Sequence, residues 1–256
     1  MIIEEIFKKN LKYINQIEMD VDTINRQFVK TVKRFYLTVG TVDLPTGRIV
    51  IGDPLAYLYT ENKKNSPQLK YSVAPGSYPV LVALCRSRYT GIRMCTLKVK
   101  LKDTEVTKYE VAYPTEETAF FKAVDGIVSG FPVDAGMVAI CDAAVADEYR
   151  EFIGEWHKNN PNKNHYDDYF EEIFKESAKK LPQFQREDGD FTEWKLPESG
   201  RRMVMVSSGF GDGFYQVFWG KDKSEEICEL IIPFVNPDII DKAEEELSEV
   251  LSIRLM

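Results

Sequence analysis

Apolar and polar residues alternate over several stretches of the chain, as they do in strands that bury one face. The clearest alternation runs from 95 to 102, with apolar side chains at the odd positions and Thr96 and three lysines at the even ones. An unbroken apolar run at 77–85 predicts a strand buried on both faces, and 105–113 is expected to pair with 95–102 as the next antiparallel strand. Further strands are predicted at 137–141, 191–196, 201–207, 214–220 and 227–234.

Apolar residues at helical spacing predict an N-terminal helix within the first 30 residues, two central helices at about 143–157 and 164–181, and a C-terminal helix. Asp142 is a suitable N-cap for the first central helix, and Asn236-Pro237 would begin the last one. The central helices carry aromatic stripes, which are typical of a helix face that docks on a sheet. The sequence therefore predicts an α+β fold with mostly antiparallel sheets.

The composition indicates one ordinary folded domain. Hydrophobic residues make up 44% and charged residues 29% of the chain, as in globular proteins. Because no internal repeat or long linker divides the chain, 1–256 is interpreted as a single α+β domain. The polar segment 183–190 is expected to be a mobile loop within it.

Charge and cysteine usage limit the partners. The net charge of −8 gives an acidic surface that repels phosphodiester backbones, so no nucleic-acid partner is expected. The lysines of 98–102 are interpreted as a solvated sheet face. No apolar run approaches a membrane span and the first residues do not resemble a signal peptide, so no membrane is expected. Four cysteines without a C-x-x-C pair are typical of buried free thiols, which favours the cytoplasm.

Several common chemistries lack their residues. The only histidines, His157 and His165, lie eight positions apart around a loop, which is not the spacing of a zinc helix. Both are expected at the surface near helix ends. The chain contains no nucleophile elbow, no Walker loop and no dinucleotide fingerprint. No cofactor is identified from the sequence.

The densest candidate for chemistry is the turn 209–215, which has three glycines in its first five residues and lies between two apolar runs. Glycine permits positive φ and the close approach of a ligand or another backbone. Asp212 sits between Gly211 and Gly213, and Tyr215 follows. The candidate site includes all four residues.

Two other acidic turns belong to the same candidate site, at Asp53 in Gly52-Asp53-Pro54 and at Asp134 before Ala135-Gly136. Each carboxylate could simply cap its own turn. Alternatively, the three aspartates could converge on one site, where a divalent cation is a possible ligand because hard cations prefer oxygen. The sequence leaves both interpretations open.

Four short blocks in order resemble the motifs of a bacterial family catalogued as domain of unknown function 4241: 52–54, 74–80, 133–136 and 208–215. The resemblance covers roughly 45 to 236. The family often has tryptophan at the position of Phe210. It carries no established activity, and an immunity-like inhibitor role is an expectation drawn from the gene neighbourhoods of such families.

Two hypotheses about function follow. The first is a non-enzymatic binding module for a ligand or partner, in which the acidic surface could steer a basic protein partner. The alternative is a carboxylate-based hydrolase, with or without a divalent metal, that uses Asp53, Asp134 and Asp212. A third interpretation is that these turns serve the fold alone. Whether the protein is an enzyme is not decided by its sequence.

Overall fold

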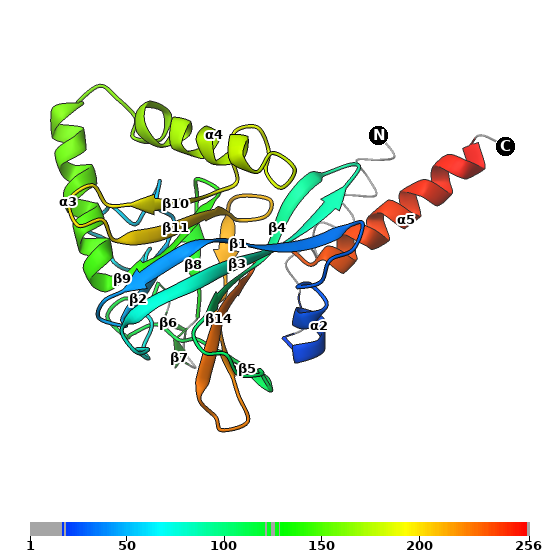
Figure 1. Cartoon of the computed structure of the whole chain (residues 1–256), viewed down its shortest axis with the longest axis horizontal. Coiled ribbons are helices and arrows are strands. Elements are labelled where there is room, and N and C mark those ends of the chain that lie inside the picture. The colour runs from blue at the N-terminus through cyan, green and yellow to red at the C-terminus, as the bar shows by residue number, and fades with distance from the viewer. Residues whose placement is uncertain (1–16, 18, 121, 124–125, 128, 255–256) are drawn as a thin grey trace.

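The computed structural model describes residues 17, 19–120, 122–123, 126–127 and 129–254. The described chain forms a six-stranded and a four-stranded sheet that pack on each other. Helices form a layer over the other face of the four-stranded sheet (Figure 1). Every strand pair in the described part of the chain is antiparallel. The predicted α+β class is confirmed.

The six-stranded sheet has the order β1-β3-β4-β14-β13-β5. Its strands are β1 (Arg34–Leu44), β3 (Gly76–Ser87), β4 (Gly91–Lys100), β5 (Lys108–Val111), β13 (Phe218–Lys221) and β14 (Ile227–Pro233). The predicted pairing of 105–113 with 95–102 is wrong, since β4 pairs with β14 and β5 pairs with β13. The N–H groups of Leu101 and Lys102 both donate to the carbonyl of Cys228. The chain therefore stays bonded to β14 beyond the end of β4 and does not fold back on β4.

The four-stranded sheet has the order β10-β11-β9-β2. Its strands are β2 (Ile49–Gly52), β9 (Met137–Asp142), β10 (Phe191–Lys195) and β11 (Arg202–Ser207). Alternation divides β11 between two cores: Val204 and Val206 face the six-stranded sheet, whereas Met203 and Met205 face the helices. Both faces of this sheet are therefore buried, which explains the continuous apolar character of β9 and β11.

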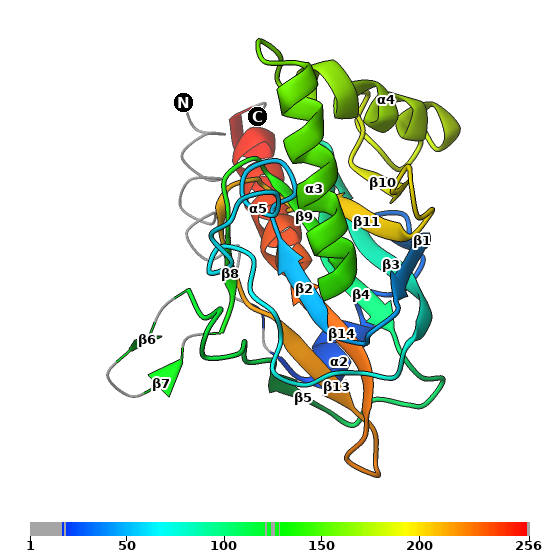
Figure 2. The ribbon, with the colours of Figure 1, turned by 90° about the vertical axis from the view of Figure 1, so that its left-hand side faces the viewer.

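Two central helices cover the outer face of the four-stranded sheet, as Figure 2 shows for α3 (Ala143–Asn159). A π-helical turn, η1 (Tyr166–Phe170), leads into α4 (Glu171–Lys180). The Asp142 side chain accepts a bond from the Ala144 N–H at 2.9 Å and caps α3 as predicted. The aromatic stripes meet the sheet around Trp194, whose ring lies 5.3–5.7 Å from those of Tyr149, Phe152 and Phe170. The prediction that these stripes dock on a sheet is confirmed.

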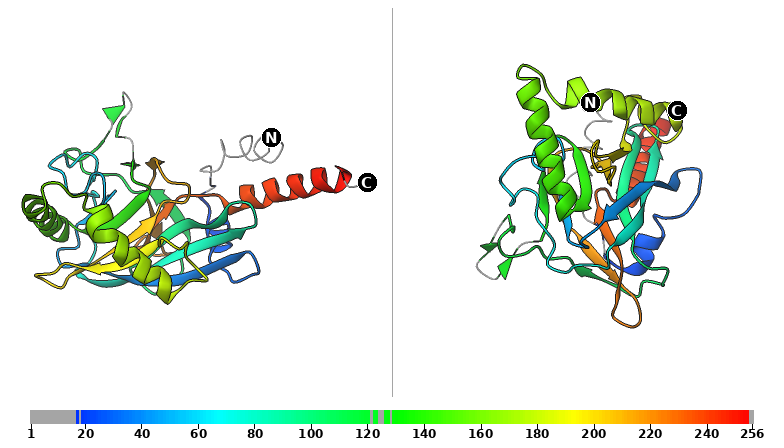
Figure 3. Two further views of the ribbon diagram at one scale, coloured as in Figure 1. Left: turned by 90° about the horizontal axis from the view of Figure 1, so that it is seen from above. Right: turned by 60° about the vertical axis from the view of Figure 1, so that its left-hand side comes forward.

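The remaining helices lie toward the ends of the chain. In α2 (Val21–Asn25), Ile24 packs with Phe218 and Ile231 on the outer face of the six-stranded sheet. The first 16 residues of the predicted N-terminal helix lie outside the described residues. Helix α5 (Pro237–Arg254) extends from the body at the end away from α3 (Figure 3). Its start is capped as predicted, because Asn236 accepts from the Asp238 N–H at 3.0 Å.

The predicted strand at 214–220 is two strands. Its first part, β12 (Gly213–Tyr215), pairs with β8 (Phe131–Val133), and its second part, β13, joins the large sheet. Apolar residues continue on both sides of the break, so the pattern does not show the change of partner. A short hairpin, β6 (Lys122–Ala123) with β7 (Gly126–Ile127), lies just before β8.

Candidate functional site

The three acidic turns lie at one end of the four-stranded sheet. In an antiparallel sheet the end of one strand lies beside the start of its neighbour. Gly52 at the end of β2 pairs with Ala139 of β9, and Ser207 at the end of β11 pairs with Met137 of β9. The turns that follow β2, precede β9 and follow β11 are therefore neighbours.

Asp53 is fully buried and ties two of these turns together. One carboxylate oxygen accepts from the N–H groups of Leu55 and Ala56, at 2.9 and 3.1 Å. The other accepts from those of Asp134 and Ala135, at 3.0 and 2.6 Å. Burial raises the pKa of this carboxyl, while the four N–H donors act in the opposite direction. Because both oxygens are occupied, Asp53 organises the backbone around it.

The glycine-rich turn packs directly against the turn at Gly136. The Ser208 N–H donates to the Gly136 carbonyl at 3.0 Å, and a Cβ on Gly136 would lie 3.5 Å from the Gly211 Cα. Buried Tyr215 braces the turn from below, with its hydroxyl 2.8 and 2.7 Å from the carbonyl oxygens of Ser208 and Gly211. Gly211 has φ +107°, a conformation that favours glycine.

Asp134 and Asp212 are exposed beside this cluster, and Gly213 begins β12. Burial and then the charges of Asp134, Asp53 and Asp212 raise the pKa of Tyr57, so all three carboxylates act on one side chain. Among the described residues, no group of three or more His, Cys, Asp or Glu side chains has the arrangement of a metal site. A cation in contact with Asp53 would have to displace backbone N–H donors.

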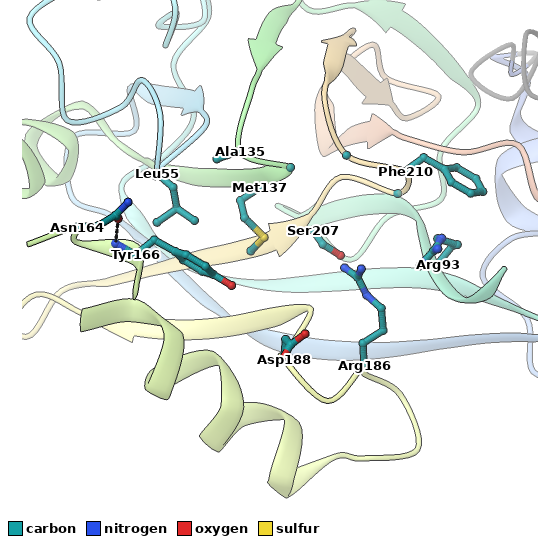
Figure 4. Close-up of a pocket in the computed structure, with 14 residues that line it drawn as sticks. Leu55, Arg93, Ala135, Met137, Asn164, Tyr166, Arg186, Asp188, Ser207 and Phe210 are labelled. Carbon is teal, nitrogen blue, oxygen red and sulfur yellow. Dashed lines mark hydrogen bonds between the residues drawn. The ribbon is translucent and has the colours of Figure 1, made fainter. Parts of the chain in front are cut away.

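A cavity of about 470 Å³ opens beside these turns (Figure 4), and we refer to it as the turn cavity. Its lining comes from all parts of this sheet end. The turns contribute Leu55, Ala135, Gly136 and 209–211, and Met137 and Ser207 come from strand ends. Asn164 lies just before η1 and Tyr166 begins it, whereas Arg186, Asp188 and Gly189 come from the segment before β10 and Arg93 comes from β4.

Two guanidinium groups face the turn cavity. Arg93 is half-buried and lies over the Phe210 ring, with its guanidinium carbon 5.0 Å from the ring centroid. Burial and then the charge of Arg186 lower the pKa of Arg93. The Nε and Nη2 of Arg186 donate to Asp190 Oδ1 at 2.8 and 2.6 Å, and this hydrogen bonding raises the pKa of Arg186. The cavity therefore has a basic wall within an acidic protein.

The segment 183–190, expected to be a mobile loop, is held by its own side chains. The buried Gln185 side chain accepts from the N–H groups of Asp190 and Phe191, at 2.9 and 3.0 Å. Ser207 Oγ donates to Asp190 at 2.9 Å. These bonds fix the position of Arg186 relative to β11.

His165 is buried, so the prediction of a surface histidine is wrong. Its ring packs edge-on against Tyr59 at 4.7 Å and His157 at 5.1 Å. Burial, with a smaller contribution from His157, lowers its pKa to about 4. His165 lies between the loop after β2 and the residues Asn164 and Tyr166, and it therefore supports one wall of the turn cavity.

Reasoning from the sequence missed Arg93 and Arg186. Neither arginine belongs to a glycine or aspartate motif, and they come from different strands and loops. One available signal was that Arg93 interrupts the apolar run of β4 at a position where burial is otherwise expected. The other was the spacing of Arg186 and Asp190 in a short polar segment.

The fold and the turn cavity define an α+β protein in which three separate turns line one cavity. The chain belongs to the family described as protein of unknown function (DUF4241), whose model matches residues 42–232. This range contains all three acidic turns and both cavity arginines. No curated protein and no solved structure matches the chain. In the described part of the chain, every helix is too short or too polar to span a bilayer.

Proposed function

We propose that this protein is a non-enzymatic binding module that takes a small ligand in the turn cavity. The observation that carries the proposal is the convergence of three separate turns on one cavity lined by Ala135, Gly136 and 209–211. The volume of about 470 Å³ lies within the range of small-molecule sites, roughly 300–1,000 Å³. The lining combines apolar surface with a few charged groups, as such sites usually do.

Partner binding is a second form of the same proposal. Phe210 is 40% exposed at the edge of the cavity, and aromatic side chains are enriched at interfaces. A basic partner, as in an immunity-like role, would suit the net charge of −8. The ligand-binding form has more support, because a concave site is present beside Phe210.

The hydrolase alternative has less support. It requires Asp53, Asp134 and Asp212 to act together, yet Asp53 uses both carboxylate oxygens on four backbone N–H groups. The remaining pair is exposed, whereas catalytic carboxylates usually lie in partly desolvated clefts. Asp212→Asn would test it in a broad hydrolase screen, since this substitution leaves the backbone bonds of Asp53 intact.

We also propose that the protein works in the cytoplasm. All four cysteines are buried and free, as expected in a reducing compartment. Fractionation of the native host, followed by detection of the protein, would test this location.

The binding proposal is tested by a ligand-observed NMR screen of small molecules against three proteins. Ala135 is exposed and lines the turn cavity, so Ala135→Trp should fill it. Ser199→Trp is the matched control, because Ser199 lines a different cavity between α3 and the 197–199 turn. We expect ligands that bind the wild type and Ser199→Trp to lose binding to Ala135→Trp. Ligands that bind all three proteins equally, or no ligands at all, would contradict the proposal.

A further inference from the structure

The two arginines of the turn cavity differ in their hydrogen bonds and ion pairs. Arg93 makes no ion pair with a carboxylate of the described residues, and its Nε is buried without a hydrogen-bond partner among them. Its Nη1 reaches only the carbonyl of the preceding residue, Ile92, at 3.1 Å. A half-buried cation with an unsatisfied donor is costly unless something supplies an acceptor.

Arg186 lines the same cavity, and Figure 4 shows its guanidinium reaching in from the segment before β10. Asp190, whose side chain is 2% exposed, holds Nε and Nη2 and leaves Nη1 free of that anchor. The Asp190 carboxylate also accepts from Ser207 and from the Arg186 N–H. It is therefore committed to positioning Arg186 and is not available to Arg93.

The other acidic group at the cavity is Asp188, which is exposed on the rim. Asp190 pairs directly with Arg186, and the charge of Asp188 also raises the pKa of that guanidinium. Burial and the charge of Arg186 lower the pKa of Arg93, and the only carboxylate that acts against them is Asp190, which is already bonded to Arg186. Among the described residues, Arg93 therefore carries the one guanidinium charge at the cavity that is not directly paired with a carboxylate. Phe210, stacked on Arg93, fixes the direction of that charge.

We propose that the ligand of the turn cavity is a small organic anion, whose carboxylate or phosphate lies between the guanidinium groups of Arg93 and Arg186. This inference rests on the proposed binding function and names its ligand class. Guanidinium groups recognise both oxyanions through paired hydrogen bonds. The apolar part of the anion contacts Leu55, Met137 and Phe210, which line the same cavity.

The test uses matched pairs of probes: carboxylates with their primary amides, and phosphate monoesters with their parent alcohols. Binding to the full chain is measured by ligand-observed NMR and then by calorimetry. We expect the anion of a pair to bind and its neutral counterpart to bind about tenfold or more weakly. The two series distinguish a carboxylate ligand from a phosphate ligand.

Arginine variants test whether the anion binds between Arg93 and Arg186. Arg93→Met and Arg186→Met should each weaken the anion about tenfold or more, whereas Arg48→Met should not. Arg48 is the matched control, because it is exposed and its side chain hydrogen-bonds only to Thr46 among the described residues. Arg93→Lys keeps the charge but loses the paired donors, so it should recover only part of the affinity. Thermal unfolding of each variant confirms that it is folded.

The outcomes separate this inference from the proposal beneath it. Neutral probes that bind as tightly as anions, while Ala135→Trp abolishes both, would overturn the anion inference and leave the binding function intact. Anions that bind Arg93→Met as well as the wild type would overturn it too, as would an anion series with no binder. Anions that bind Ala135→Trp unchanged would overturn both.

Discussion

Asp53 is buried and Arg93 is half-buried beside the same group of turns, and the two charged side chains differ in how fully the protein itself hydrogen-bonds them. Asp53 accepts four backbone N–H bonds and joins two turns. Arg93 has a buried Nε that nothing in the described chain satisfies. A charged group whose hydrogen bonds are all made within the protein stabilises the fold. A charged group with an unsatisfied donor is suited to binding a ligand that supplies the acceptor. The comparison supports a structural role for Asp53 and the proposed ligand-binding role for Arg93.

The sharpest way to break this comparison is to remove Asp53. Asp53→Ala leaves four N–H groups at 2.6–3.1 Å without their acceptor. Since each buried unsatisfied group costs about 1–3 kcal/mol, we expect the free energy of unfolding to fall by about 4 kcal/mol or more. Urea denaturation measures it. Asp134→Asn, at an exposed position whose side chain holds none of these bonds, should change it by less than about 0.5 kcal/mol. Equal losses for both variants would refute the structural role of Asp53.

Lowering the pH should destabilise the protein through buried His165, which supports one wall of the turn cavity. Its pKa falls from 6.5 to about 4 in the folded protein, so the folded state binds fewer protons than the unfolded state between these values. The contribution of His165 to the free energy of unfolding is therefore fully present above pH 6.5. It is lost as the pH falls toward 4, by about 3 kcal/mol in total at about 1.4 kcal/mol per pH unit. Urea denaturation across this range measures the slope. His165→Gln should flatten it, whereas His157→Gln should leave most of it; an NMR titration of His165 near 6.5 would contradict the prediction.

Alanine substitutions at two glycines of the same turn distinguish the cost of a steric clash from the cost of backbone strain. Gly209 has φ +67°, and a Cβ there would lie 2.3 Å from Val235 Cγ2. Gly211 has φ +107° and open space around it. We expect Gly209→Ala to cost about 2–3 kcal/mol and Gly211→Ala about 1 kcal/mol, because only the first adds a clash to the strain. Thermal unfolding compares them, and a larger cost for Gly211→Ala than for Gly209→Ala would contradict the prediction.

The smallest expected effect on stability belongs to Arg93. Replacing an uncompensated half-buried cation by an apolar side chain of similar length relieves its desolvation. We therefore expect the free energy of unfolding of Arg93→Met to lie within about 0.5 kcal/mol of the wild-type value, or above it. A loss of several kcal/mol in urea denaturation would mean that Arg93 belongs to the fold, as Asp53 does.

Much of the fold could be predicted from the hydrophobic pattern. The stripes of α3 and α4 and the caps at Asp142 and Asn236 depend on residues close together in the chain, and the structure confirms them. Strand pairing could not be predicted in the same way. The strand 108–111 pairs with 218–221, and no local signal distinguishes that partner from the nearer 95–102.

The site followed the same division. The acidic turns could be located because aspartate and glycine mark turns, and they do lie together at one sheet end. Arg93 and Arg186 could not, because their proximity depends on the packing of β4 against the segment before β10. Burial of His165 was equally hidden, since its neighbours Tyr59 and His157 come from a loop and the end of a helix.

The position of β14 within the large sheet has a consequence for biosynthesis. This strand, Ile227–Pro233, fills the gap between β4 and β13, so β4 keeps one edge open until residues 227–233 have left the ribosome. Contacts this distant in sequence form slowly, and an unpaired edge invites association with other chains. A nascent chain stalled before residue 227 should therefore bind chaperones, whereas release of β14 from the ribosome should free it.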